Sequence, residues 1–363
     1  MNSYIPAFLI GYSDSSFTNP HETVLPDEPA DCRGMFTHMG VKYWGFETDR
    51  HRSTTTDATQ RRFLFDHDAH HWIHIGFQER AVVNQISIST KWFTGNQVRE
   101  VSVTLIDELN GNEIEVLTRQ PLNPDSEHVF DVSGIMASEA LIHCYYEGGI
   151  SRINFFGMAT EEQMPEHQNM LVNAAISNIS NSHYGSPAMA VNGQRKETHM
   201  VGWESARTGF GEQAVFHLAE PVRVEEIVVD TYMHRLNPPL SSHVFGLDLQ
   251  PGTTLDQAMK KAPRWKLVFD GDFEVIPENF QSYMLGQEYL REKGIRDCRK
   301  FAIELHQPDP ELWRAVLPFA PLAADTFHRF RDIIDGGPFT HILYMHYPNG
   351  GIHGLKLYGE VIL

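Results

Sequence analysis

The sequence predicts an all-β protein made of two tandem β-sandwiches of the jelly-roll type. Two observations carry this prediction. An ordered set of short phrases occurs twice along the 363 residues, once in each half of the chain. Each half also contains short runs rich in Val, Ile, Thr and aromatic residues, separated by Gly, Asn and Asp, and without long intervening helices. Such runs are typical of antiparallel strands in sandwiches and jelly rolls.

The repeated phrases keep the same order in both halves. CYYEGGISRINFFG begins at Cys144 and MHYPNGGIHGLKLYG begins at Met345, and their GGI triplets are 202 residues apart. PLNPDSEHVF and PLAADTFHRF are 200 apart, and GFETDR and GWESAR are 157 apart. ISISTKWFTGN and IVVDTYMHRLN end at Asn96 and Asn237, 141 apart, and SDSSFTNP is similar to SNSHYGSP. Five matches in one order indicate a tandem duplication.

The spacing of these phrases predicts the domain organisation. We expect a first repeat at 1–158, a polar linker at 159–172 and a second repeat at 173–363. The offset grows from 141 to 200, so the second repeat holds 59 additional residues, which we expect at about 241–297. The stretch from Asn279 to Gly294 has a helical composition and ends at a glycine, which predicts a partly helical insert.

The strands can be placed within each repeat. In the first, HHWIHIGF, VVNQISIST and VREVSVTLI alternate in the manner of half-buried strands, and VRVEEIVVDT and HILYMHY do so in the second. Each GGI triplet is followed by another alternating run, SRINFFG or HGLKLYG. We therefore expect a tight turn at the glycines, with positive φ at Gly149 and Gly351, and then the closing strand of each jelly roll.

Composition excludes several classes of function. The chain carries 47 acidic residues against 29 Lys and Arg, a formal net charge of −18, which disfavours binding to nucleic acid or to anionic membrane surfaces. Three widely spaced cysteines and no long apolar run favour reduced thiols in a cytoplasmic protein. The sequence leaves a homo-oligomer open.

The ordered phrases resemble the allantoicase family over nearly the whole chain apart from the insert. The shared features are a G-[FW]-E-[TS]-x-R loop, a strand that ends in Asn, a P-L phrase followed by His, and the GGI ending, each present twice. The resemblance implies a pair of galactose-binding-like jelly rolls and hydrolysis of allantoate, a small anionic substrate, to ureidoglycolate and urea. The first Arg of the family's doublet is replaced by Asp49 and Ala206.

Release of urea from a ureido carboxylate requires an acid, a base or metal for water, and a cation for the carboxylate group. Glu47 and Glu204, in the repeated loops, are the candidate acid or base residues. Arg50 and Arg207 are the candidate carboxylate ligands, because a guanidinium bonds both oxygens at once. The alternative for each Arg is a structural ion pair with the Glu of its own loop.

Further candidates also occur in pairs. His128 and His328 hold equivalent positions, either as catalytic groups that orient substrate or as half-buried structural histidines. Asn96 and Asn237 end equivalent strands, where an amide could bind a ureido group or simply tolerate a turn.

Two unpaired residues complete the candidate substrate-binding set. Arg152 follows the first GGI, and Asn349 precedes the second.

The sequence shows no motif for an organic cofactor. The run DHDAHHWIH, from Asp66 to His74, leaves a divalent metal open but lacks a partner motif, so solvated or edge-strand histidines are the simpler interpretation. Two alternatives to an allantoicase-like hydrolase remain from the residues alone: a relative altered to another small-molecule reaction, and a ligand-binding jelly roll without activity.

Overall fold

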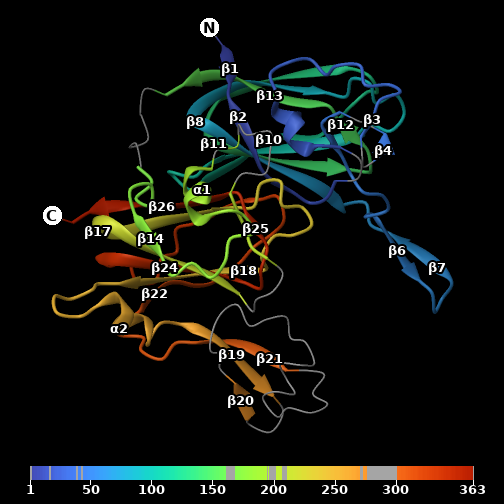
Figure 1. The fold of residues 1–363 in the computed structure, drawn as a ribbon. Coiled ribbons are helices and arrows are strands. Elements are labelled where there is room, and N and C mark those ends of the chain that lie inside the picture. The colour runs from blue at the N-terminus through green and yellow to red at the C-terminus, as the bar shows by residue number, and fades with distance from the viewer. Residues whose placement is uncertain are drawn as a thin grey trace. The chain divides into compact units, whose positions relative to one another are not determined.

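A computed structural model shows two compact units, Met1–Glu166 and His167–Leu363, in the order that the repeats predict (Figure 1). Both units are built almost entirely from antiparallel strands. The structure describes residues 2–15, 18–37, 40–41, 44–160, 168–193, 195, 202–206, 211–269, 273–275 and 301–362.

In the first unit, one seven-stranded sheet makes both layers of the sandwich. Its order is β1 (Ser3–Ile5), β13 (Arg152–Ala159), β8 (His70–Ser89), β11 (Glu127–Tyr145), β9 (Glu100–Asp107) and β10 (Asn112–Pro121), and β2 (Ala7–Tyr12) also pairs with β8. The first half of β8 pairs with β2 and the second half with β13, so the long strand passes from one layer to the other. Bulges in the β8–β11 ladder allow the bend.

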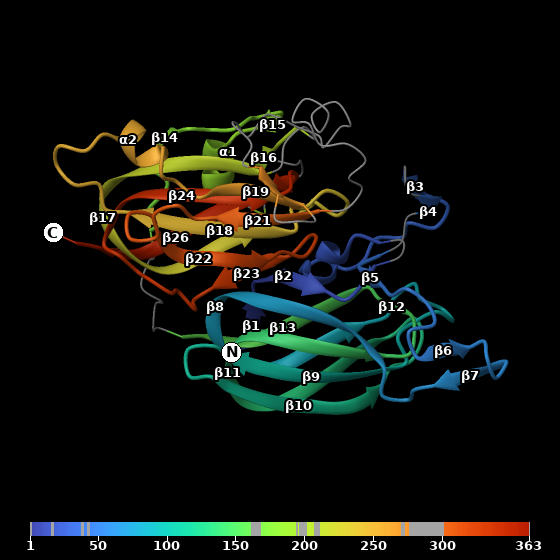
Figure 2. The same cartoon turned by 90° about the horizontal axis from the view of Figure 1, so that it is seen from below.

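Smaller elements close the ends of the first unit. A 3-10 turn, η1 (Pro20–Val24), lies near β2, and β5 (Phe46–Glu47) pairs with β12 (Gly149–Ile150). The hairpins β3 (Phe36–Thr37) with β4 (Gly40–Val41), and β6 (Thr54–Asp57) with β7 (Arg62–Phe65), extend from the same unit (Figure 2).

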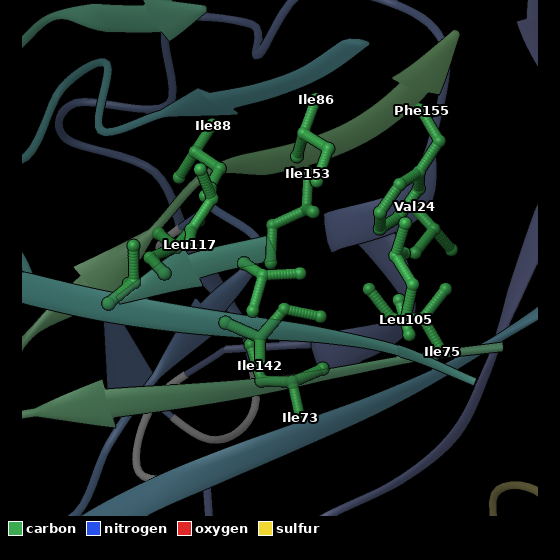
Figure 3. Packing of buried hydrophobic residues seen from close by; sticks show 14 of the residues in the cluster. Val24, Ile73, Ile75, Ile86, Ile88, Leu105, Leu117, Ile142, Ile153 and Phe155 are labelled. Carbon is green, nitrogen blue, oxygen red and sulfur yellow. The ribbon is translucent and has the colours of Figure 1, made fainter. Parts of the chain in front are cut away.

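The interior of the first unit is aliphatic. Along β8, Ile73 and Ile75 point inward and are fully buried, whereas Trp72 and His74, which alternate with them, are half-buried on the outer face. Figure 3 shows Ile73 and Ile75 in the same cluster as Ile86, Ile88 and Phe155 from both layers. Burial of each such side chain stabilises the fold by about 1.5–3 kcal/mol, so the alternating pattern stabilises the packing of the two layers.

The second unit repeats this plan. Its main sheet contains β14 (Ala175–Ser177), β17 (Glu212–Asp230), β24 (Phe339–Tyr347), β18 (Ser241–Leu247) and β22 (Arg314–Pro321), and β23 (Phe327–Phe330) and β26 (Gly354–Val361) pair with β17. A small sheet joins β15 (Tyr184–Gly185), β16 (Trp203–Glu204) and β25 (Gly351–Ile352). The short helix α1 (Pro187–Asn192) begins at the Ser186 cap.

The additional residues of the second unit lie later than expected. Strand β18 pairs with β24 and β22 as β9 pairs with β11 and β10, so Ser241–Leu247 belongs to the sandwich and the expected start at Ser241 is wrong. The insert falls between β18 and β22 and contains α2 (Leu255–Met259), β19 (Arg264–Phe269), β20 (Phe273–Val275) and β21 (Ala302–His306) (Figure 1). The expected helix at 279–294 lies outside the described residues.

Candidate functional site

The repeated G-[FW]-E-[TS] loop directs a carboxylate away from the core in each unit. In the first, Phe46 points into the hydrophobic core and is fully buried. The preceding Gly45 has φ 58°, and a Cβ on it would lie 2.4 Å from the carbonyl oxygen of Ile150. Only glycine therefore allows the loop to approach β12 this closely. Glu47 follows Phe46 in an extended strand and points to the opposite side.

Glu47 is hydrogen-bonded to Asn96, the residue that ends the repeated phrase ISISTKWFTGN. The Asn96 side-chain amide donates to Oε1 of Glu47 over 3.3 Å, while Oε2 is buried without a hydrogen-bond partner among the described residues. Burial raises the pKa of the Glu47 carboxyl, and the Asn96 hydrogen bond and the positive charge of Arg50 offset only part of this effect. The environment thus makes the charged form of Glu47 less favourable than it is in water.

The second unit repeats the pair with better geometry. The Asn237 side-chain amide donates to Oε1 of Glu204 over 2.9 Å. Glu204 is half-buried, whereas Glu47 is only 5% exposed. The sequence singled out these four residues separately, and the structure brings them together as two equivalent carboxylate–amide pairs.

The glycines of the GGI triplet adjoin the carboxylate–amide pair in each unit. The first glycine makes the turn, since Gly148 and Gly350 have φ 153° and 140°. The expectation of positive φ at Gly149 and Gly351 is therefore wrong by one residue. These second glycines are required for another reason, because a Cβ on either would lie 2.0 Å from the ring of Phe93 or His234.

The turn is also fastened to the acidic loop. In the first unit, the Thr48 N–H donates to the carbonyl of Gly148, whose own N–H donates to Thr48 Oγ1, both over 3.0 Å. Ser205 and Gly350 exchange the same two bonds in the second unit, over 2.9 and 3.0 Å. The Thr or Ser of the loop motif thus fixes the Glu against the GGI turn.

Of the two candidate arginines, the structure describes Arg50. Arg50 is exposed and forms no ion pair within the described ranges, although its charge acts on Glu47. Its guanidinium thus remains open to a ligand, and the structural ion pair with Glu47 is not observed there. Arg207 lies outside the described residues.

The paired histidines hold turns together. His128 accepts from the Asn123 N–H over 2.8 Å and its other nitrogen faces the carbonyl of Ile88 at 3.2 Å. His328 makes the equivalent contact with the Ala323 N–H over 2.8 Å, and its Nδ1 faces the Val229 carbonyl oxygen. Because both ring nitrogens bond to backbone, these contacts favour the structural alternative over a catalytic one.

Arg152 and Asn349 differ in their surroundings. Arg152 is 8% exposed and donates to the carbonyls of Asp27 and Ser151 over 2.8 and 2.7 Å, so it anchors a loop. Asn349 is half-buried beside the Gly350 turn. Of the two, only Asn349 lies next to a carboxylate–amide pair, because Gly350 is bonded to Ser205 of the Glu204 loop.

Sequence reasoning missed a second pair of hydrogen-bonded side chains, which occupies equivalent positions in the two sandwiches. In the first unit, Nδ1 of His71 lies 2.6 Å from Oδ2 of Asp14. In the second, Asn181 donates to Glu212 over 2.7 Å. The similarity between SDSSFTNP and SNSHYGSP was the signal that could have located both pairs, since Asp14 and Asn181 are equivalent positions in it.

The histidines of the DHDAHHWIH run make contacts with other side chains. His71 binds Asp14, His74 lies 2.8 Å from Glu139, and His70 stacks on His143 with ring centroids 4.2 Å apart. No group of three or more His, Cys, Asp or Glu side chains within the described residues is arranged to hold a metal ion. Within the same part of the chain, no helix has both the length and the apolar character to cross a membrane.

Comparison with known proteins agrees with the duplicated architecture. A family model described as "Allantoicase repeat" matches residues 2–160 and 166–289. The chain is 23% identical to a probable allantoicase of Pseudomonas savastanoi pv. phaseolicola, over 97% of this chain and 93% of the relative. It is 24% identical to a probable allantoicase of Rhizobium meliloti, over 96% and 90%. A crystal structure of allantoicase from Saccharomyces cerevisiae aligns over 98% of this chain and 90% of that chain at 18% identity, with a TM-score of 0.33. Because the family model covers most of both repeats, the chain belongs to the allantoicase family.

Proposed function

We propose that this protein is an allantoicase-like hydrolase that converts allantoate to ureidoglycolate and urea. Family membership along both repeats supports the reaction class. The observation that carries the proposal is the carboxylate–amide pair, Glu47 with Asn96 and Glu204 with Asn237, which both repeats retain. A carboxyl group oriented by an amide at a loop suits proton transfer better than it suits ligand binding alone.

The chemistry requires one carbon–nitrogen bond to break and one carbon–oxygen bond to form. A protonated Glu gives its proton to the nitrogen that departs with urea, and becomes a carboxylate. The carboxylate then takes a proton from the water whose oxygen bonds to the central carbon, which restores the acid. Burial raises the pKa of Glu47, which supports an acid role for the Glu of this loop because burial disfavours the charged form.

Binding of the substrate carboxylate requires a local cation, because the chain carries a formal net charge of −18. Arg50 is exposed near Glu47 and is suited to this task in the first repeat. Arg207 holds the equivalent sequence position in the second. Asn96, Asn237 and Asn349 supply amides that could bond to the ureido groups.

The test is urea release from allantoate by the purified protein, measured with and without divalent ions. We expect turnover by the wild type and a loss of at least about 100-fold in kcat when both Glu47→Gln and Glu204→Gln are present, the size typical of general acid–base groups. Glutamine keeps the shape and the amide contact but cannot carry the proton. Absence of urea from the wild-type protein, or full activity in the double variant, would contradict the proposal.

A further inference from the structure

Three buried histidines lie at the loop end of the second repeat, close to the Glu204 pair. His234, His346 and His353 are at most 2% exposed. Nδ1 of His234 and both ring nitrogens of His346 and His353 have no hydrogen-bond partner within the described part of the chain. Buried imidazole nitrogens without partners destabilise a fold, so their presence requires an explanation other than stability.

The first repeat shows that the fold does not need these imidazoles. At the offsets of 141 and 202, the equivalent positions hold Phe93, Cys144 and Ser151. Phe93 and Cys144 are buried apolar residues, and Ser151 donates to the carbonyl of Ser89 over 2.8 Å. The same structural positions are thus apolar or satisfied in one repeat, whereas in the other they carry buried ring nitrogens that lack a partner among the described residues.

His234 is the member that connects this cluster with the acidic loop. In the small sheet, Glu204 is directly opposite Gly351, and the ring of His234 packs against the Cα of Gly351. Three residues after His234, Asn237 binds the Glu204 carboxylate through its side chain and the Gly351 N–H through its carbonyl. His234 and Glu204 are therefore attached to the same turn.

The groups that face His234 come from several elements. Glu204 lies on β16, Asp230 ends β17, His346 lies on β24 and His353 follows β25. The charges of Glu204, Asp230 and His353 act on His234, and His234 acts on His346. Asp230 is already paired with Arg195 through two bonds of 2.8 and 2.9 Å, which leaves Glu204 as the acidic group at the exposed side.

Access also differs between the repeats. Glu47 is 5% exposed, and its Oε2, which has no partner among the described residues, is buried, so a substrate reaches it less easily than it reaches Glu204. Glu204 is half-buried, with a polar cluster beneath it in place of the Phe93 ring. Of the two repeats, the second is thus the one whose acidic loop can better contact both water and a polar substrate.

We infer that the second repeat carries the working site, with His234 as a positioning residue that acts through Glu204, and that the first repeat is its structural copy. The inference rests on the proposed function. His234 orients the Glu204 turn by packing against Gly351, which is directly opposite Glu204. Burial lowers the pKa of His234, so the imidazole is neutral near pH 7 and becomes a cation only in acid. A charge on this buried ring disturbs the packing that orients the Glu204 turn.

The experiment exchanges residues between repeats. His234→Phe installs the residue that the first repeat uses at this position, so the fold has a precedent for it, and Phe93→Leu is the matched control. We expect His234→Phe to lower kcat for urea release by about 100-fold and to displace the acid limb of the pH profile, with little change in Tm. Phe93→Leu should keep both kcat and the limb, and Glu204→Gln alone should give the same loss as the double Glu variant.

A second exchange, His353→Ser, places the first repeat's Ser151 residue in the cluster and should lower kcat by about 10-fold if the cluster supports His234. The inference is wrong if His234→Phe and His353→Ser both retain wild-type kcat and an unmoved acid limb. It is equally wrong if Glu204→Gln remains active. A wild-type protein that releases no urea would instead contradict the proposed function itself.

Discussion

Nδ1 of His71 lies 2.6 Å from Oδ2 of Asp14, and the pair occupies the place that Glu212 and Asn181 hold in the second repeat. The backbone contacts are the same in both: Asp14 accepts from the Asp49 N–H over 2.8 Å, and Asn181 from the Ala206 N–H over 2.9 Å. The carboxylate lies on the loop in the first repeat and on the strand in the second, while the backbone contacts are the same. One consequence is that the second repeat buries its acid completely.

Glu212 should make stability depend on pH. Burial raises its pKa from 4.5 to about 7, despite the hydrogen bonds from Ser180 and Asn181. Because the folded state holds this proton more tightly, the stabilisation is complete below about pH 4.5 and is lost as pH rises to about 7. At 1.36 kcal/mol per pKa unit the total is roughly 3 kcal/mol. Glu212→Gln cannot titrate and should lack this slope.

The measurement is the free energy of unfolding in urea at several pH values for wild type and Glu212→Gln. Contributions of other groups, such as His346, cancel in the difference. We expect the difference to shift in favour of the variant by roughly 3 kcal/mol between pH 4.5 and 7.5. A difference that stays constant over this range would show that Glu212 is ionised throughout.

The Asn237 side chain should matter for catalysis more than for folding. Asn237→Ala removes the 2.9 Å bond to Glu204 but keeps the backbone carbonyl that binds the Gly351 N–H. A side-chain hydrogen bond contributes about 0.5–1.5 kcal/mol, which predicts a loss of roughly 2- to 10-fold in kcat. Steady-state urea release measures this, with Tm as the control. A Tm that falls in proportion to activity would assign the bond to stability.

The GGI turn offers a test of the packing beneath the site. A Cβ on Gly351 would lie 2.0 Å from Cε1 of His234, so Gly351→Ala should destabilise the protein by about 1–3 kcal/mol. Adding His234→Ala creates room for the methyl group, and the double variant should be more stable than the sum of the two single changes predicts. Strict additivity in urea denaturation would mean that the ring does not lie against the turn.

The fold was predictable because the repeat phrases lie at its structural turns. The insert boundary was not, and β18 shows the reason. Its seven residues are all buried, since the sandwich covers one face and the insert the other. The period-2 alternation that identified β8 is therefore absent from β18, although its equivalent β9 retains half-buried positions. A strand that is buried on both faces lacks this alternation, so its sequence is not distinguished from that of a loop or an insert.

The site was predictable in its residues but not in its contacts. Glu47 and Asn96 were each notable for recurring in the second repeat, yet their hydrogen bond joins segments 49 residues apart. The buried histidines of the second repeat gave no signal at all, because their counterparts Phe93, Cys144 and Ser151 share no chemistry with them. Their burial without hydrogen-bond partners among the described residues, which the structure shows, gives the substitution its meaning.

The described part of the insert packs against the outer face of the second sandwich. Trp313 and Trp265 join Phe245, Leu343 and Met345 in one buried cluster. Deletion of residues 241–297, the range that the sequence predicts for the insert, would remove β18 from the sheet, so folded protein is not expected from it. Removal of residues 248–313 spares β18 but exposes the apolar face, and we expect aggregation rather than an altered activity.

Trp313→Ala tests the insert without deleting it. The side chain is fully buried and its indole N–H donates to the carbonyl of Ala258 over 3.0 Å, which joins α2 to the end of the insert. Loss of a buried Trp costs about 3–5 kcal/mol, so the midpoint of urea unfolding should fall sharply. The matched control is Lys261→Ala, which breaks a largely exposed ion pair with Asp309 within the same insert and should cost less than about 1 kcal/mol. If Trp313→Ala unfolds at the same urea concentration as Lys261→Ala, the insert does not contribute to the core, and the apolar face of the sandwich must be stable without it.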